Sequence, residues 1–134
     1  MTYSKFMRYV LTFEAIVLNF GTGALCLVAP QSLVAQFTPQ TIPQVGLEFL
    51  RWYGVVLWVL AYVVLRILPM NDNRMLFPAV EGLLMGDVVH LIACYFFFQA
   101  VPVWSFAFIV MVVSATTLAT LRSIWVYRYH THRI

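Results

Sequence analysis

The chain has 134 residues, of which 63% are hydrophobic and only 10% are charged. Soluble domains carry about a quarter charged residues, so this composition excludes an ordinary soluble protein. The net charge of +3 is spread over separate short segments, and we therefore expect no nucleic-acid partner.

Four apolar stretches follow one another, at residues 9–28, 45–68, 77–100 and 103–127. Each reaches the roughly 20 residues that a helix needs to cross a ~30 Å hydrocarbon layer. The sequence therefore predicts a single all-α domain over residues 1–134, an integral membrane four-helix bundle with antiparallel up-down-up-down topology. Its expected environment is the lipid bilayer of the endoplasmic reticulum or of a bacterial inner membrane.

Most basic residues lie near the N-terminus, in the second loop and close to the C-terminus. With an even number of spans, these three segments share one side of the membrane. The positive-inside rule then predicts that both termini are cytoplasmic. Arg51 does not fit this rule, because it lies within the second stretch.

The first stretch contains two polar residues, Glu14 and Asn19. It also contains Gly21 and Gly23, and small residues of this kind let helices approach closely in a bilayer. Pro30 follows the stretch and ends the helix, because a proline cannot continue the backbone hydrogen bonding.

One side of the second stretch combines charged and aromatic residues when a helix is drawn at 100° per residue, namely Glu48, Arg51, Trp52, Trp58 and Tyr62. Arg51 would lie about 9 Å below the outer surface. Glu48, three residues earlier, is its natural ion-pair partner. Ordinary helix packing with aromatic residues at the interface is the alternative explanation of this stripe.

In the third stretch, Gly82 and Gly86 form a G-x-x-x-G pair, a pattern that favours close approach of a neighbouring helix. Asp87 and His90 lie one turn apart near mid-membrane, so both side chains can face one cavity. In the fourth stretch, Arg122 lies within the last two turns. We expect its long side chain to reach back to the cytoplasmic interface.

Four of the five acidic residues lie inside the predicted spans, where each charge at mid-membrane costs roughly 2.5–3.5 kcal/mol. These side chains must therefore face the bundle interior, paired, neutral or in contact with water. By depth, an outer and central group comprises Glu48, Arg51, Asp87, His90 and Asn19. An inner group comprises Glu14, Glu81 and Arg122. Within it, an ion pair between Glu14 and Arg122 would lock the first helix to the last.

Two hypotheses explain the central group. It is either a polar network that fixes helix packing, or a cavity in which one group acts as an acid and another as a base. In the catalytic hypothesis, the acid–base residues are Asp87 and His90 on one side and Glu48 and Arg51 on the other. The residues expected to contact the substrate are Trp52, Trp58, Tyr62, Asn19 and Glu14. The aromatic faces among them can stabilise a developing cation.

We expect no metal and no cofactor. His90 is the only histidine within a predicted span, so a set of metal ligands is not apparent. The sequence also contains no glycine-rich phosphate loop after a strand and no haem-attachment motif.

Three short motifs resemble the broad group of small four-helix membrane proteins that includes the DoxX-like families. They are Ala29-Pro30 after a glycine-containing first helix, Glu48-x-x-Arg51-x-x-Gly54, and Gly86-Asp87-x-x-His90. A looser similarity, one of chemical logic, links the chain to emopamil-binding-type sterol isomerases and to membrane-integral meroterpenoid cyclases. Those proteins also place acids and aromatic residues within a helical bundle. No catalytic residue is carried over from either.

The sequence therefore predicts a membrane-embedded enzyme that performs cofactor-independent acid–base chemistry on a lipophilic small molecule. The favoured reactions are opening of an epoxide by hydrolysis or cyclisation, or a related isomerisation. The alternative is a non-catalytic small subunit or assembly factor of a larger membrane complex. Homo-oligomerisation is compatible with both hypotheses.

Overall fold

The computed structural model describes residues 3–70 and 72–132, and the regular structure of this part of the chain is entirely helical. The elements are α1 (Tyr3–Phe13), η1 (Glu14–Phe20), α2 (Gly21–Val28), α3 (Pro30–Val34), α4 (Gln44–Ile67), η2 (Leu68–Met70), α5 (Asn73–Ala100) and α6 (Phe106–His132). Four continuous helical segments are long and apolar enough to cross a membrane, namely Tyr3–Val28, Gln44–Met70, Asn73–Ala100 and Phe106–Thr131. The predicted all-α fold with four membrane spans is confirmed.

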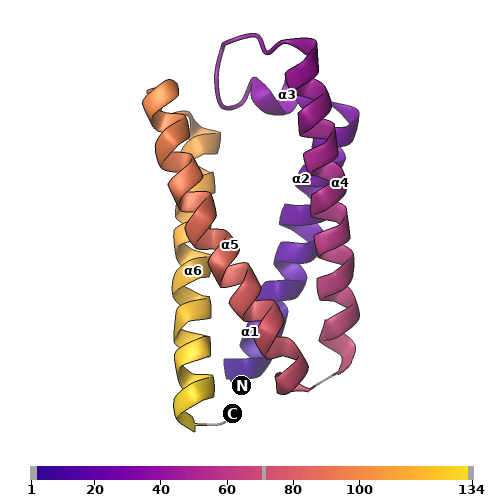
Figure 1. Cartoon of the computed structure of the whole chain (residues 1–134), viewed down its shortest axis with the longest axis vertical. Coiled ribbons are helices and arrows are strands. Elements are labelled where there is room, and N and C mark those ends of the chain that lie inside the picture. Colours follow the sequence, from indigo (N-terminus) through magenta and orange to yellow (C-terminus); the bar gives the residue numbers. More distant parts are fainter. Residues whose placement is uncertain (1–2, 71, 133–134) are drawn as a thin grey trace.

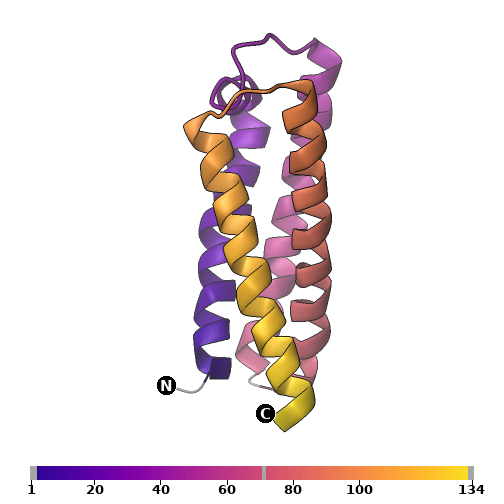
Figure 2. The same cartoon turned by 90° about the vertical axis from the view of Figure 1, so that its left-hand side faces the viewer.

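The four long helices form two hairpins. The helix α2 packs along α4, and α5 packs along α6 (Figure 1). The hairpins are linked by α1, which contacts α6, and by the short connection between α4 and α5. Figure 1 shows that the hairpins lie close together at the end that carries both termini and farther apart at the opposite end. A view turned by 90° shows the same helices running between the two ends of the molecule (Figure 2).

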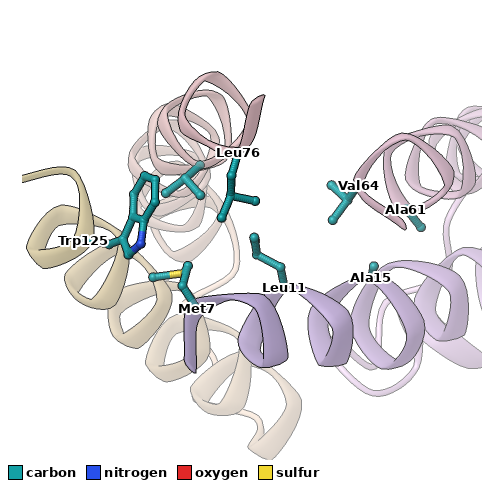
Figure 3. Close-up of a cluster of buried hydrophobic side chains, with 8 residues drawn as sticks. Met7, Leu11, Ala15, Ala61, Val64, Leu76 and Trp125 are labelled. Atoms are coloured by element: carbon teal, nitrogen blue, oxygen red, sulfur yellow. The ribbon is translucent and has the colours of Figure 1, made fainter. Parts of the chain in front are cut away.

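The apolar core lies in the half of the molecule that carries the termini. Figure 3 shows its side chains in close-up. All four spans contribute to it, with Met7, Leu11, Ala15, Ala61, Val64, Leu76, Val80 and Trp125. Polar contacts close the same end. The Arg8 guanidinium donates hydrogen bonds to the Leu68 carbonyl at 2.7 Å and to the Asn73 Oδ1 at 3.3 Å. The first span is thereby held to the connection between α4 and α5.

Two glycines set the distance between α2 and α4. A Cβ atom added at Gly54 would lie 2.8 Å from the Gly23 carbonyl oxygen and 2.8 Å from the Cys26 Cβ. The backbones are therefore in contact, as small residues allow in a bilayer. This confirms the expected close approach for Gly23. At Gly21, in contrast, an added Cβ would meet nothing within 4 Å beyond its own helix backbone and chain neighbours.

The glycine pair of α5 faces open space. A Cβ atom added at Gly82 or Gly86 would meet nothing within 4 Å, and both residues are exposed. The pair therefore does not mediate helix packing within this chain. In α5 only Leu76, Val80 and Cys94 are buried, so most of this helix is available to lipid or to another protein.

We predict that Gly54→Ala lowers the free energy of unfolding by about 1–3 kcal/mol, because the new methyl group forces two backbones apart. The matched control is Gly86→Ala, which adds the same methyl group to a site with nothing within 4 Å. Unfolding by SDS titration in mixed micelles measures both effects. Equal stability of the two variants would contradict the assigned contact between α2 and α4.

Candidate polar site between the hairpins

A single buried cation joins three of the four spans. Arg122 of α6 has a relative exposure of 0%. Its Nη2 donates to the Glu14 carboxylate of η1, and its Nη1 donates to the Asp87 carboxylate of α5. The same Nη1 also donates to the Leu83 carbonyl of α5 at 3.3 Å. The structure thus contains a buried ion triad, Glu14–Arg122–Asp87.

This triad confirms one predicted pair and corrects two predictions. Glu14 does pair with Arg122 and ties the first span to the last. Arg122, however, does not extend to the membrane interface near the end of its helix, because its side chain is fully buried. Because α6 continues to His132, the residue lies about 15 Å from the end of its helix, too deep for that interface. Asp87 consequently pairs with Arg122 of the inner group, although its depth predicts it in the outer and central group.

A π-helical segment positions Glu14. In η1 (Glu14–Phe20) the backbone hydrogen bonds join residues five apart. Residues 14 and 19 therefore lie nearly one above the other, whereas in an α-helix they would be about 140° apart. Both Glu14 and Asn19 are accordingly buried, with relative exposures of 7% and 8%. The composition of Glu14–Phe20 does not distinguish a π-helix from an α-helix, so the sequence alone does not predict this segment.

The two carboxyl groups are more accessible than the cation that they share. The side chains of Glu14 and Asp87 keep 10% and 12% of their exposure, and Arg122 keeps none. His90, one turn beyond Asp87 on α5, is half-buried. The carboxyl groups thus form the accessible side of the triad, and the guanidinium lies behind them.

The triad carries an excess of negative charge when both acids are ionised. Two carboxylates and one guanidinium sum to −1, and an uncompensated charge in an apolar interior is costly. Binding one proton to the two carboxyl groups removes this excess. The site is therefore suited to hold a proton that either acid can carry.

Two buried donors on the same face of α6 have no acceptor among the described residues. They are the Nε of Arg122 and the Nε1 of Trp125, three residues apart. Buried N–H groups are nearly always paired with protein or with ordered water. A water molecule or an oxygen atom of a ligand is the kind of group that would satisfy them.

The structure separates Glu48 and Arg51 from Asp87 and His90. The ion pair between Glu48 and Arg51 is confirmed, and the Arg51 Nε also donates to the Leu27 carbonyl at 3.4 Å. However, the residues of α4 that share the core cluster with Ala15, next to Glu14, are Ala61 and Val64. Arg51 precedes Ala61 by ten residues, which is about 15 Å along the helix. The prediction that both pairs face one cavity is therefore wrong.

The aromatic stripe of α4 faces outward. Trp52, Trp58 and Tyr62 have relative exposures of 67%, 43% and 61%, whereas the buried residues of α4 are Gly54, Leu57, Ala61 and Val64. The stripe therefore cannot line a cavity with Asp87. Lipid is as apolar as the protein interior, so an amphipathic pattern in a span does not reveal which side faces inward.

Among residues 3–70 and 72–132, no group of three or more His, Cys, Asp or Glu side chains is placed to hold a metal ion. Comparisons of the chain with protein-family models, with curated proteins and with solved structures find no match.

We predict that Arg122→Met destabilises the protein by about 3–5 kcal/mol, because it leaves the carboxyl groups of Glu14 and Asp87 without their cation. Adding Glu14→Gln and Asp87→Asn to this variant should restore most of the loss. The matched control is Arg128→Met, an exposed position on the same helix. Unfolding in detergent measures the series, and an Arg122→Met variant as stable as the control would refute the assigned triad.

Proposed function

We propose that the protein is a membrane-embedded enzyme that performs acid–base chemistry on a lipophilic small molecule at the Glu14–Arg122–Asp87 triad. The observation that carries this proposal is the charge count of the triad, two carboxyl groups on one buried guanidinium. Acid–base catalysis needs one group that gives a proton and one that takes a proton. Two acids that share one cation and one proton supply both.

Opening of an epoxide is the reaction that fits this pair best. The protonated carboxyl group gives its proton to the epoxide oxygen as the C–O bond breaks. The carboxylate takes a proton from the nucleophile, either water or an internal hydroxyl group of the substrate, as the new C–O bond forms. The proton balance of the triad is then restored, and no cofactor is consumed. An isomerisation that adds a proton at one carbon and removes one at another uses the same two groups.

Several features of the site support this role. The carboxyl groups are the accessible part of the triad, and Arg122 behind them keeps the ionised acid paired. His90 lies one turn from Asp87 and provides a second base, and Asn19 lies on the same side of η1 as Glu14. The bilayer itself would deliver a lipophilic substrate to the side of the bundle. Glu48 and Arg51 have no part in this chemistry, because they lie outside the triad.

We predict that Glu14→Gln and Asp87→Asn each lower turnover of lipophilic epoxides by about 10²–10⁴-fold, the usual contribution of a general acid or base. The matched control is Glu81→Gln, which removes an exposed acid six residues before Asp87 and should retain turnover. Product formation by purified protein in nanodiscs provides the measurement. The elution profile in detergent establishes that each variant is folded.

Wild-type turnover that both Glu14→Gln and Asp87→Asn retain in full would refute the catalytic role of the triad. Loss of turnover in Glu81→Gln as well would also count against it, because that residue does not contact Arg122.

A second candidate function is a non-catalytic small subunit of a larger membrane complex. The exposed glycine pair of α5 supports it, since Gly82 and Gly86 offer a surface that another helix can approach closely. Under this hypothesis the triad only fixes the packing of the chain, and the free side of α5 contacts the partner.

We predict for this second function that Gly86→Leu releases a stoichiometric partner during purification from native membranes, because the larger side chain blocks close helix approach. Gly21→Leu is the matched control, because Gly21 is also an exposed helical glycine with nothing within 4 Å. Quantitative mass spectrometry of the purified material compares the two. Identical partners in wild type and Gly86→Leu would exclude this surface of α5 as the contact.

A further inference from the structure

A second feature lies on the outer side of the α2–α4 hairpin. An open groove there is lined by Phe20, Leu27, Val55, Trp58, Val59 and Tyr62, and its surface is almost entirely apolar. Val55, Val59 and Tyr62 each have at least half of their surface exposed. The groove therefore faces the hydrocarbon layer and is separate from the triad.

Trp58 in the wall of this groove is packed and hydrogen-bonded against the first span. The Trp58 Nε1 donates a hydrogen bond to the Phe20 carbonyl at 3.1 Å. The Phe20 ring packs edge-on against the indole, with the ring centroids 5.5 Å apart. A Cβ atom added at Gly23 would lie 2.4 Å from Trp58 Cδ1, so the absence of a side chain at Gly23 makes room for the indole. A preformed surface of this kind loses little conformational entropy on binding.

A charged pair lies at one end of the groove. Arg51 is one turn before Val55 on the same stripe of α4, and its Nε donates to the carbonyl of Leu27, which lines the groove. The side chains of Arg51 and Glu48 are 37% and 47% exposed, so both charges reach the surface. The groove is thus apolar along its length and carries a positive and a negative group at one end.

The dimensions match one leaflet of a bilayer. Arg51 and Tyr62 are eleven residues apart on α4, which is about 16 Å along the helix. Half of a ~30 Å hydrocarbon layer is about 15 Å. The helical segment Gln44–Met70 exceeds that layer by about 5 Å at each end, so Glu48 lies close to the head groups.

We propose that this groove binds one molecule of a zwitterionic phospholipid that carries a primary amine, with an acyl chain along the apolar wall. Its phosphate contacts Arg51, and its ammonium group contacts Glu48. Arginine and carboxylate are the side chains that bind these two groups by charge-assisted hydrogen bonds. An anionic lipid without an amine would leave Glu48 beside its phosphate, and a neutral lipid would use neither charge. The proposal does not depend on the function proposed for the triad.

Native mass spectrometry of the full chain tests the proposal. The protein is incubated in mild detergent with an equimolar mixture of phosphatidylethanolamine, phosphatidylglycerol and diacylglycerol that have the same acyl chains. We expect one phosphatidylethanolamine to be retained in preference to the other two, and we expect Arg51→Gln to reduce its retention about fivefold, the effect of one half-exposed ion pair.

Two groove-filling variants and a matched control test whether the acyl chain of the lipid lies in the groove. Val55→Trp and Val59→Trp place an indole inside the groove and should abolish retention, whereas Val56→Trp makes the same change at an exposed neighbour that does not line it. Thermal unfolding establishes that all three variants are folded. Equal retention by Val55→Trp, Val59→Trp and Val56→Trp would overturn the proposal. Equal or stronger retention of either other lipid by the wild type would also overturn it.

Discussion

The packing of the two hairpins depends on the guanidinium of Arg122. Each hairpin is held together by its own apolar contacts, through Gly23 and Gly54 in one and along α5 and α6 in the other. Between the hairpins, contacts are concentrated at the end that carries the termini. Arg122 is the buried cation that donates to both sides, to Glu14 in the first hairpin and to Asp87 in the second. Because charged hydrogen bonds are directional, this contact fixes both the distance and the rotation of the hairpins.

The charges that hold the two hairpins together also suit the triad to acid–base chemistry. A buried ion pair is a weak source of stability, since the cost of removing its charges from water offsets most of the attraction. One carboxylate is enough to neutralise one guanidinium. The second acid adds a negative charge that a bound proton or a ligand would compensate. This excess is the physical reason to regard the triad as more than a packing device.

The sequence predicts the spans well and their orientation about the helix axis poorly. Four apolar runs of sufficient length identify the four long helices, and an acid in a bilayer demands a cation, which identifies the pair of Glu14 and Arg122. The pairing of Asp87 with Arg122 is not predicted, because the depth of Arg122 depends on where α6 ends. The polar residues after Tyr127 do not stop that helix. The inward orientation that the sequence predicts for the aromatic stripe of α4 fails for a different reason, because lipid and core are equally apolar and both accept tryptophan.

The π-helical turn of the first span has a consequence for how one helix serves two partners. Before this turn, α1 packs against α6 of the second hairpin, and after it, α2 packs against α4 of its own hairpin. A wider turn contains an additional residue, so it changes the angular phase between the segments that it joins. The contact face of α1 and the contact face of α2 are thereby set independently within one continuous helix. Removing one residue from the turn would bring the two faces into a single α-helical phase, so only one of them could keep its partner.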